Sequence, residues 1–277
     1  MKKKLRRIAS FLFLGLVILY AGSCRWIDTQ LGAETAEGLT RTAMKTRASW
    51  TVSYLSGGKT GTGPRLIYVH GTPGSATAFN EYLLDPVDGL ESISIDRPGF
   101  GATEPLAPAL TLGEQALAID PFLIERDGRW PILIGHSMGA PIICKVAAMW
   151  PGKVGGLVIL SGALDSALEE VYWYQRVADF AFVPYLIPRI LRNSNTELVP
   201  LKHELELLRP QLAAIQCPVT IVHAPNDSLV PFANVEYMKS HIPNIRDVVI
   251  LEGMDHFTPW NSRPAIVDAI RKLVQAP

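Results

Sequence analysis

The stretch WPILIGHSMGAPIICKVAAMW, residues 130–150, joins two apolar runs through a short turn that contains one serine. The aliphatic run before the turn is typical of a buried strand, and the run after it is typical of a helix. Ser137 stands between Gly135 and Gly139 in a G-x-S-x-G pattern. A tight strand-to-helix turn of this kind strains the serine backbone, and the glycines remove side chains that would collide with neighbouring elements. The pattern predicts that Ser137 is a nucleophile whose hydroxyl projects from the edge of a sheet.

Short apolar runs closed by turn residues recur along the chain, and most lack a polar alternation. Such runs are typical of strands that are buried on both faces. Amphipathic segments expected to be helical lie between several of them, which favours a mostly parallel sheet with helices on both faces. The expected strands lie within residues 50–56, 65–71, 91–99, 131–137, 156–162, 218–227 and 246–256, and the expected helices within 111–125, 139–150, 231–242 and 262–275.

One long interval, residues 166–217, contains no convincing strand. It is rich in helix formers and large aromatic residues, and several prolines divide it into short pieces. We expect a small helical cap inserted after the strand at residues 156–162, which is strand 6 of the expected fold, above the sheet edge where ligands bind in open α/β folds. The expected division is an N-terminal segment 1–24, a tether 25–48, a core made of 49–165 and 218–277, and the cap 166–217.

A nucleophilic serine needs a base, and the base needs an orienting acid. Asp227 follows the apolar run VTIVH and His256 follows the run VVIL, so both lie where strands are expected to end. Asp165 also follows a strand and is the main rival for the acid. Asp255 precedes the histidine, and we expect it to point away from the ring. The chain order serine, acid, histidine is the one that accompanies a G-x-S-x-G turn.

Five motifs together resemble the α/β-hydrolase fold family over roughly residues 50–275. They are HGTPGS, DRPGFG, GHSMGA, HAPND and GMDHF, at residues 70–75, 96–101, 135–140, 223–227 and 253–257. The chain is most similar to the capped branch that contains esterases, lipases, carbon–carbon bond hydrolases, epoxide hydrolases and haloalkane dehalogenases. The last two use an aspartate nucleophile, so Ser137 argues against them. Ala224 replaces the glycine usual at the start of the acid loop.

Two backbone N–H groups are expected to stabilise the oxyanion of a tetrahedral intermediate. The geometry of the strand-to-helix turn at Ser137 indicates the N–H of Met138, directly after the nucleophile, as the first donor. The resemblance implies Thr72 as the second donor, because the residue after the His-Gly pair donates in related families. His70 is interpreted as a loop-shaping residue. The DRPGFG motif is expected to hold its own loop through local hydrogen bonds.

The N-terminus begins with the basic run MKKKLRR and continues with an apolar, charge-free run that ends in AGSC. This order is typical of an export signal, and small residues before a cysteine resemble a bacterial lipobox in which Cys24 receives lipid. The alternatives are an uncleaved membrane anchor and an ordinary secreted product. All three predict a protein of the cell envelope, either anchored to a membrane or periplasmic or secreted.

The charge balance and the spacing of the histidines limit the classes of function that fit this chain. The 26 basic residues balance the 26 acidic ones, which is not typical of a nucleic-acid binder. The six histidines show no metal-binding spacing, and no metal or organic cofactor is implied. We expect a serine hydrolase that cleaves ester-type acyl bonds of a small to medium, partly apolar substrate. Carbon–carbon bond hydrolysis, acyl transfer and a non-catalytic ligand-binding role are the alternatives. No pattern indicates the oligomeric state.

Overall fold

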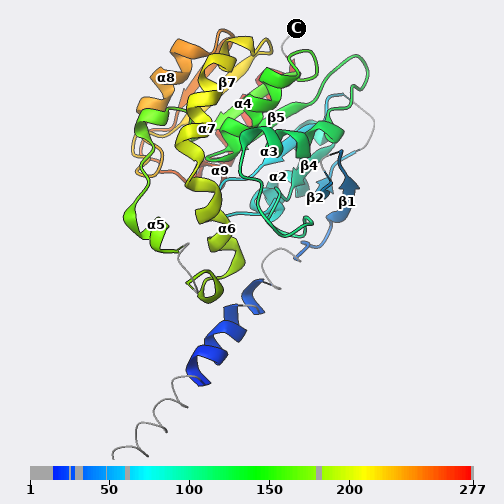
Figure 1. Ribbon diagram of the computed structural model, residues 1–277. Coiled ribbons are helices and arrows are strands. Elements are labelled where there is room, and N and C mark those ends of the chain that lie inside the picture. Colours follow the sequence, from blue (N-terminus) through cyan, green and yellow to red (C-terminus); the bar gives the residue numbers. More distant parts are fainter. Residues whose placement is uncertain are drawn as a thin grey trace, which may run out of the picture.

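The architecture is that of a computed structural model, which describes residues 15–24, 26–28, 34–47, 49–59, 63–178 and 183–275. Eight strands form one sheet in the order β1-β2-β4-β3-β5-β6-β7-β8 (Figure 1). The first two strands run antiparallel to their neighbours, and the other neighbouring pairs are parallel. The mostly parallel sheet predicted from the sequence is therefore confirmed. The strands are β1 (Thr40–Lys45), β2 (Thr51–Gly57), β3 (Leu66–Val69), β4 (Ser92–Ile95), β5 (Ile132–His136), β6 (Gly156–Leu160), β7 (Val219–His223) and β8 (Ile245–Ile250).

Strand β1 corrects the sequence analysis, which placed residues 25–48 in a tether. Residues Thr40–Lys45 instead pair along their whole length with β2 at the edge of the sheet. None of the six residues is fully buried. An edge strand with both faces largely in solvent needs no apolar periodicity, so its sequence carries no strand signal.

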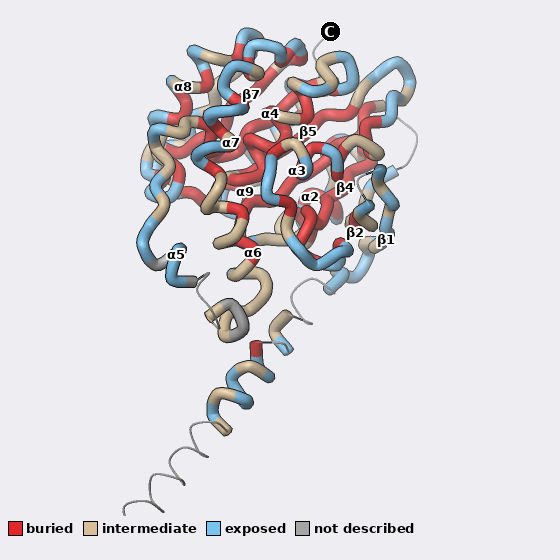
Figure 2. Tube along the Cα trace, viewed as in Figure 1, coloured by how far each residue is buried: buried red, intermediate tan, exposed pale blue. Residues whose placement is uncertain are grey.

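Helices cover both faces of the sheet. Alternate residues of the strands belong to two apolar cores, one on each face of the sheet. Ile67, Leu133 and Ile159 lie in the first core, and Tyr68 and Val158 lie in the second. The first core packs against α3, α4 and α8, and the second against α2 and α10, so the buried part of the chain lies at the centre of the fold (Figure 2). These helices are α2 (Asn80–Leu84), α3 (Leu112–Ile119), α4 (Gly139–Met149), α8 (Ala233–His241) and α10 (Arg263–Gln275), and the short α9 (Thr258–Asn261) precedes α10.

The described residues between β6 and β7 form short helices and contain no strand. We call residues 166–217 the helical insertion. Its elements are the 3-10 helix η4 (Ser166–Leu168), α5 (Trp173–Ala178), the 3-10 helix η5 (Val183–Leu186), α6 (Arg189–Leu198), α7 (Leu201–Leu208) and the 3-10 helix η6 (Arg209–Ala214). Helix α7 packs into the core beside α4.

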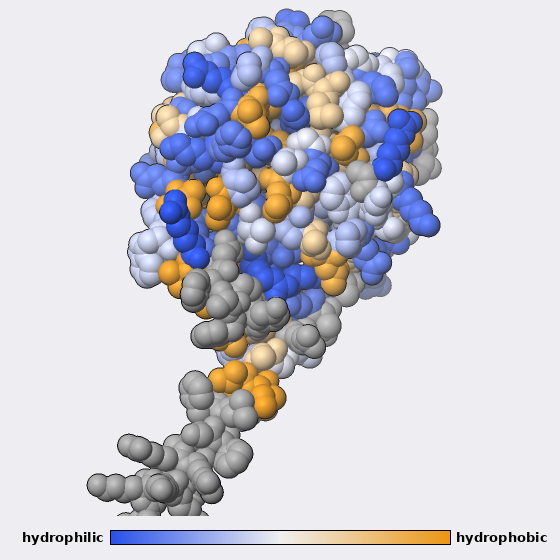
Figure 3. Space-filling model, viewed as in Figure 1, coloured by the Kyte–Doolittle hydropathy of each residue, from blue (hydrophilic) through white to orange (hydrophobic). Residues whose placement is uncertain are grey.

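Residues 15–24 form a helix that projects from the end of the molecule where α5 and α6 lie (Figure 1). Its base contacts the helical insertion: the Cys24 thiol lies 3.7 Å from the carbonyl oxygen of Leu186, and the Asp28 carboxylate accepts a 2.5 Å hydrogen bond from the Arg189 amide. Apolar surface is visible where this helix leaves the globular part (Figure 3). Within the described ranges, no helix combines the length and the apolarity that crossing a membrane requires.

Candidate active site

Ser137 occupies the turn between β5 and α4, as the sequence predicts. Its backbone has a φ of 53°, in the left-handed region that L-residues rarely adopt. A Cβ at Gly135 would lie 2.6 Å from the Gly139 carbonyl oxygen, and a Cβ at Gly139 would lie 2.2 Å from the Val69 carbonyl oxygen. Both glycines are therefore required by close backbone contacts. The turn holds the serine between the end of β5 and the N-terminus of an 11-residue helix.

The Asp227 carboxylate holds His256 through one ring nitrogen. Its Oδ2 accepts a 2.8 Å hydrogen bond from His256 Nδ1, and its Oδ1 accepts bonds from the amides of Leu229 and Val230 at 3.0 and 2.8 Å. Burial by itself raises the pKa of Asp227, but the hydrogen bonds from His256 and the two amides outweigh burial and hold this pKa below its ordinary value. The charged carboxylate fixes the proton on Nδ1, which leaves Nε2 as an acceptor.

The two rival acids have other partners. Asp165 begins the 3-10 helix η4, where its side chain accepts a 2.9 Å bond from the Ala167 amide. Asp255 accepts hydrogen bonds from the Phe257 amide and the Asn261 side chain, which shapes the turn before α9. The structure therefore brings Asp227, and neither rival, to His256.

Ser137 and His256 line one cavity of about 760 Å³. Among the described residues no hydrogen bond joins their side chains, and such bonds commonly tighten only when a substrate binds. The helical insertion supplies part of the wall through α6, and most of the remaining wall comes from loops at the carboxyl ends of the strands. The apolar part of the wall includes Met138, Ile190, Leu191, Leu198, Leu201, Leu229, Val230, Phe257 and Trp260.

The two expected amide donors, Thr72 and Met138, both line this cavity. Within the described chain, neither N–H group donates a hydrogen bond to a protein acceptor. Close packing holds their two segments together, since a Cβ on Gly71 would lie 2.9 Å from the Ser137 Cβ. The arrangement leaves these two backbone donors, which have no acceptor among the described residues, in the cavity that Ser137 also lines.

His136 supports the His256 loop, a role that the sequence analysis did not assign. Its Nε2 lies 3.0 Å from the His256 carbonyl oxygen and donates to it, because a carbonyl oxygen only accepts. The His136 ring also meets the Trp260 ring edge to face at 5.4 Å. Burial and the neighbouring His256 lower the pKa of His136 to about 3. The only sequence signal was its position inside the G-x-S-x-G pattern, which does not distinguish a structural residue from any other.

His223, at the end of β7, supports the acid loop and was also missed. Its Nε2 donates a 3.0 Å hydrogen bond to the Val230 carbonyl oxygen and lies 3.7 Å from Asp227 Oδ2. Burial lowers the pKa of His223, so the ring stays neutral beside the carboxylate. Nothing in the run VTIVHAPND separates this histidine from an ordinary strand residue.

The buried neutral histidines predict a specific pH dependence of stability. The unfolded chain protonates His136 near pH 6.5, whereas the folded state does not until about pH 3. Below pH 6.5 the unfolded state therefore binds more protons, and stability falls as the pH decreases. From pH 7 to pH 5, His136 alone is expected to remove about 2 kcal/mol from the free energy of unfolding, and urea titrations at the two pH values measure this loss.

In the variant His136→Gln, the difference between the free energies of unfolding at pH 7 and at pH 5 is expected to be smaller than in the wild type by about 2 kcal/mol. The exposed His203 provides the control, because His203→Gln makes the same exchange of side chains at the surface. An unaltered pH difference in the His136 variant would show that this histidine is charged in the folded state.

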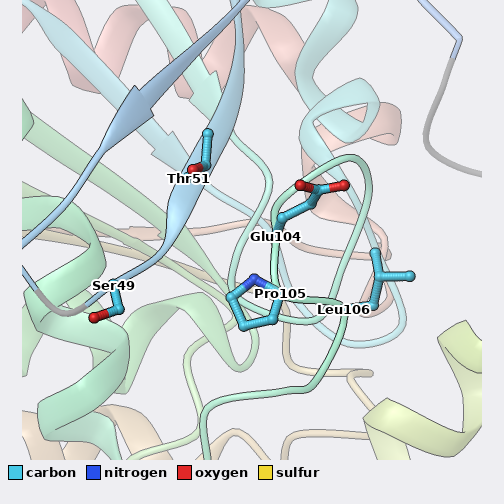
Figure 4. Close-up of a pocket in the computed structure, with 5 residues that line it drawn as sticks. All are labelled: Ser49, Thr51, Glu104, Pro105 and Leu106. Carbon is cyan, nitrogen blue, oxygen red and sulfur yellow. The ribbon is translucent and has the colours of Figure 1, made fainter.

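A smaller pocket of about 390 Å³ lies where the loop at Glu104 crosses the start of β2, and is lined by Ser49, Thr51, Glu104, Pro105 and Leu106 (Figure 4). It shares no lining residue with the cavity of Ser137. Its lining contains one carboxylate and no base or nucleophile with a partner for acid–base chemistry. The cavity that contains Ser137 is therefore the better candidate for an active site.

A parallel sheet, a serine on a strained turn and a histidine–aspartate pair at the same sheet edge define the hydrolase class of α/β proteins. The chain belongs to the alpha/beta hydrolase family, whose sequence pattern matches residues 66–270. A relative from Mycobacterium phage D29, described as a candidate non-heme haloperoxidase, is 29% identical over 140 residues, which are 50% of this chain and 49% of the relative. The chain spans about half the length of the first curated relatives it matches.

Solved structures show the same fold. A candidate lipase of Acinetobacter baumannii AYE superposes with a TM-score of 0.67 at 19% identity, over 85% of this chain and 92% of the lipase. A membrane phospholipase A superposes with a TM-score of 0.63 at 19% identity, over 99% of this chain and 98% of that protein. At these identities the likeness establishes the fold of the chain.

Proposed function

We propose that this protein is a serine hydrolase that cleaves carboxylic ester bonds. The observation that carries the proposal is the 2.8 Å bond between Asp227 and His256, whose ring lines the same cavity as the strained Ser137. In this role His256 Nε2 takes the proton of the Ser137 hydroxyl, and the serine oxygen attacks the ester carbonyl. The protonated His256, stabilised by Asp227, then returns the proton to the leaving alcohol.

The acyl-enzyme formed in this way is released by water. His256 would deprotonate the water, the resulting hydroxide would attack the acyl carbon, and Ser137 would leave with the proton from His256. The amides of Thr72 and Met138 would hold the oxyanion in both halves of the reaction. Ser137, His256, Asp227 and the two amides need no metal or organic cofactor for this reaction.

The cavity wall favours an uncharged, partly apolar substrate. Glu34, Glu169 and Glu170 line the cavity, and among the described lining residues there is no lysine or arginine. An anionic acyl group would therefore meet like charges without a paired cation. The names of the two structural neighbours, a lipase and a phospholipase A, both denote enzymes that cleave acyl esters, which supports an ester substrate.

A series of chromogenic esters of graded acyl length tests the proposal. A cavity of about 760 Å³ is large enough for a ligand of drug size. Each additional buried methylene is worth about 0.8 kcal/mol, so kcat/KM should rise about fourfold per methylene from the acetyl ester until the chain fills the cavity. A succinyl ester, which carries a carboxylate, serves as the control and should be cleaved more slowly than a neutral ester of similar length. A preference for the succinyl ester would contradict the assignment of the substrate class.

We also propose that the N-terminal segment stays attached and holds the enzyme at a membrane. The support is the basic, apolar order of residues 1–24, and the exposed apolar side chains Leu16, Ile18, Leu19 and Tyr20 on the described helix. Cys24 is 5% exposed, and its packing against Leu186 favours an uncleaved chain over a lipidated Cys24. Mass spectrometry of the mature protein is expected to find residues before Cys24, whereas a diacylglyceryl group on an N-terminal Cys24 would contradict this.

A further inference from the structure

The buried face of α6 is polar. The buried residues of this helix are Asn193, Ser194 and Glu197, with exposed fractions of 4%, 5% and 1%. A helix that packs on a protein core normally buries an apolar stripe, and a buried polar group is costly unless it is hydrogen-bonded. The contacts of these three residues therefore show what α6 holds in place.

Glu197 forms a buried, bidentate ion pair with Arg97, which follows β4. The two guanidinium Nη atoms lie 2.7 and 2.8 Å from the two carboxylate oxygens, and both side chains are 1% exposed. Gln115 donates a further 3.1 Å bond to Glu197. The local hydrogen bonds expected of the DRPGFG motif are present at Asp96, which accepts a 3.1 Å bond from the Ala102 amide. They are not the main contacts of Arg97, whose partner lies 100 residues away on the helical insertion.

Arg97 also reaches the loop that contains the expected oxyanion donor. Its Nη2 donates a 3.0 Å hydrogen bond to the Gly71 carbonyl oxygen. His70 Nδ1 lies 2.7 Å from the same oxygen, and His70 Nε2 accepts a 3.2 Å bond from the Arg97 amide. A carbonyl only accepts and an amide N–H only donates, so His70 is neutral with its proton on Nδ1. The Gly71 carbonyl thus receives two hydrogen bonds.

The Gly71 carbonyl and the Thr72 N–H belong to one planar peptide group. Donors on the carbonyl oxygen fix the plane of that group and polarise its N–H, which strengthens the N–H as a donor. The Thr72 hydroxyl is held independently by a 2.8 Å hydrogen bond to the Ser194 hydroxyl of α6. Helix α6 is therefore linked to this segment in two ways, directly through Ser194 and the Thr72 side chain and indirectly through Glu197 and Arg97.

We infer that Arg97, held by Glu197, is a positioning residue that sets the direction and donor strength of the Thr72 N–H. The inference rests on the proposed function, in which this N–H stabilises the oxyanion. It assigns to the helical insertion a part in the chemical step, in addition to forming the cavity wall. Neither side chain of the ion pair is among the residues that line the cavity, so the pair acts through the peptide group alone.

The test replaces the ion pair by apolar side chains of similar volume in the full chain, as Arg97→Met with Glu197→Leu. Such a replacement leaves no unpaired buried charge and is often neutral for stability. The fold offers a control in Arg65 and Glu91, a second bidentate pair with distances of 2.8 and 3.1 Å, in which Glu91 also binds the partly exposed Arg126. This pair precedes β3 and β4, at the opposite end of the same strands, so Arg65→Met with Glu91→Leu leaves the Gly71 loop intact.

The enzyme concentration is set by end-point titration with a fluorophosphonate, so that kcat refers to folded, reactive sites. The Arg97/Glu197 variant is expected to lower kcat by about 10- to 100-fold and to change KM by no more than about threefold, because the oxyanion exists only in the transition state. Its affinity for a trifluoromethyl ketone, which forms the same oxyanion, should fall by the same factor as kcat/KM. The control variant should stay within about threefold of wild type in all three quantities.

A kcat per titrated site equal to that of the control would overturn the inference, and so would a rise in KM at constant kcat. The variant Arg97→Lys serves if the double variant does not fold: a lysine can bond to Glu197 or to the Gly71 carbonyl but cannot form the bidentate pair, so an intermediate kcat is expected. A wild-type protein that neither reacts with the fluorophosphonate nor cleaves esters would instead refute the proposed function.

Discussion

Ser137→Ala is expected to lower kcat on an ester substrate by about 10⁴- to 10⁶-fold. The variant lacks the oxygen that forms the acyl-enzyme, and only the amide donors and substrate binding remain to accelerate the reaction. Reaction with a fluorophosphonate should disappear altogether, because the probe forms its bond with that oxygen. Gel-based labelling and steady-state kinetics measure the two effects.

A second serine in the fold supplies the control for this experiment. Ser161 directly follows β6 and has a φ of 46°, so it shares the left-handed backbone of Ser137, and it is fully buried beside Thr258. It does not line the cavity. Ser161→Ala should therefore keep its labelling and its kcat. Labelling that persists in the Ser137 variant would show that another residue is the nucleophile.

Asp227→Asn is expected to lower kcat by about 10⁴-fold with little change in the position of the side chain. Asp227 Oδ1 accepts bonds from the Leu229 and Val230 amides, so the oxygen of the new amide should remain there. The amide nitrogen then faces His256 Nδ1 and donates to it. The His256 proton moves to Nε2, the atom that has to accept the proton of Ser137, so the imidazole is held in the wrong tautomer.

Asp165→Asn is the matched control, since Asp165 also follows a strand and caps a helical turn through its Oδ1. It should retain kcat, because the amide oxygen can accept the same bond from Ala167. The double variant Ser137→Ala with Asp227→Asn should be no slower than Ser137→Ala alone, because residues that act as one unit are not additive. A large loss in the Asp165 variant with none in the Asp227 variant would assign the acid to Asp165.

The local parts of the site could be predicted from the sequence because short-range sterics specify them. Gly135 and Gly139 are required by backbone contacts below 3 Å, and a turn with such contacts has few compatible sequences. The strand ends that carry Asp227 and His256 were visible as apolar runs closed by turn residues. The parallel sheet follows from those runs and from the helical segments between them.

Strand β1 and the polar face of α6 could not be predicted in the same way. Sequence patterns report burial of apolar side chains, and β1 buries none of its residues. Helix α6 buries the polar residues Asn193, Ser194 and Glu197. A prediction that assumes a buried apolar face would therefore assign the wrong side of this helix to the core. Its role became visible only when the partners of its polar groups were known.

By itself the amino-acid sequence determined the order of the buried strands and of the long helices between them, the turn that presents Ser137, and the identity of a serine, acid and histidine in one chain order. These features depend on interactions between residues close in sequence, or on the periodic burial of apolar side chains. Only the tertiary structure decided that Asp227 rather than Asp165 meets His256, and that Arg97 pairs with Glu197. The first of these contacts joins residues that are 29 positions apart in the sequence, and the second joins residues that are 100 positions apart. Such hydrogen bonds produce no periodic sequence pattern, because their energy depends on the distance between side chains that only the fold brings together.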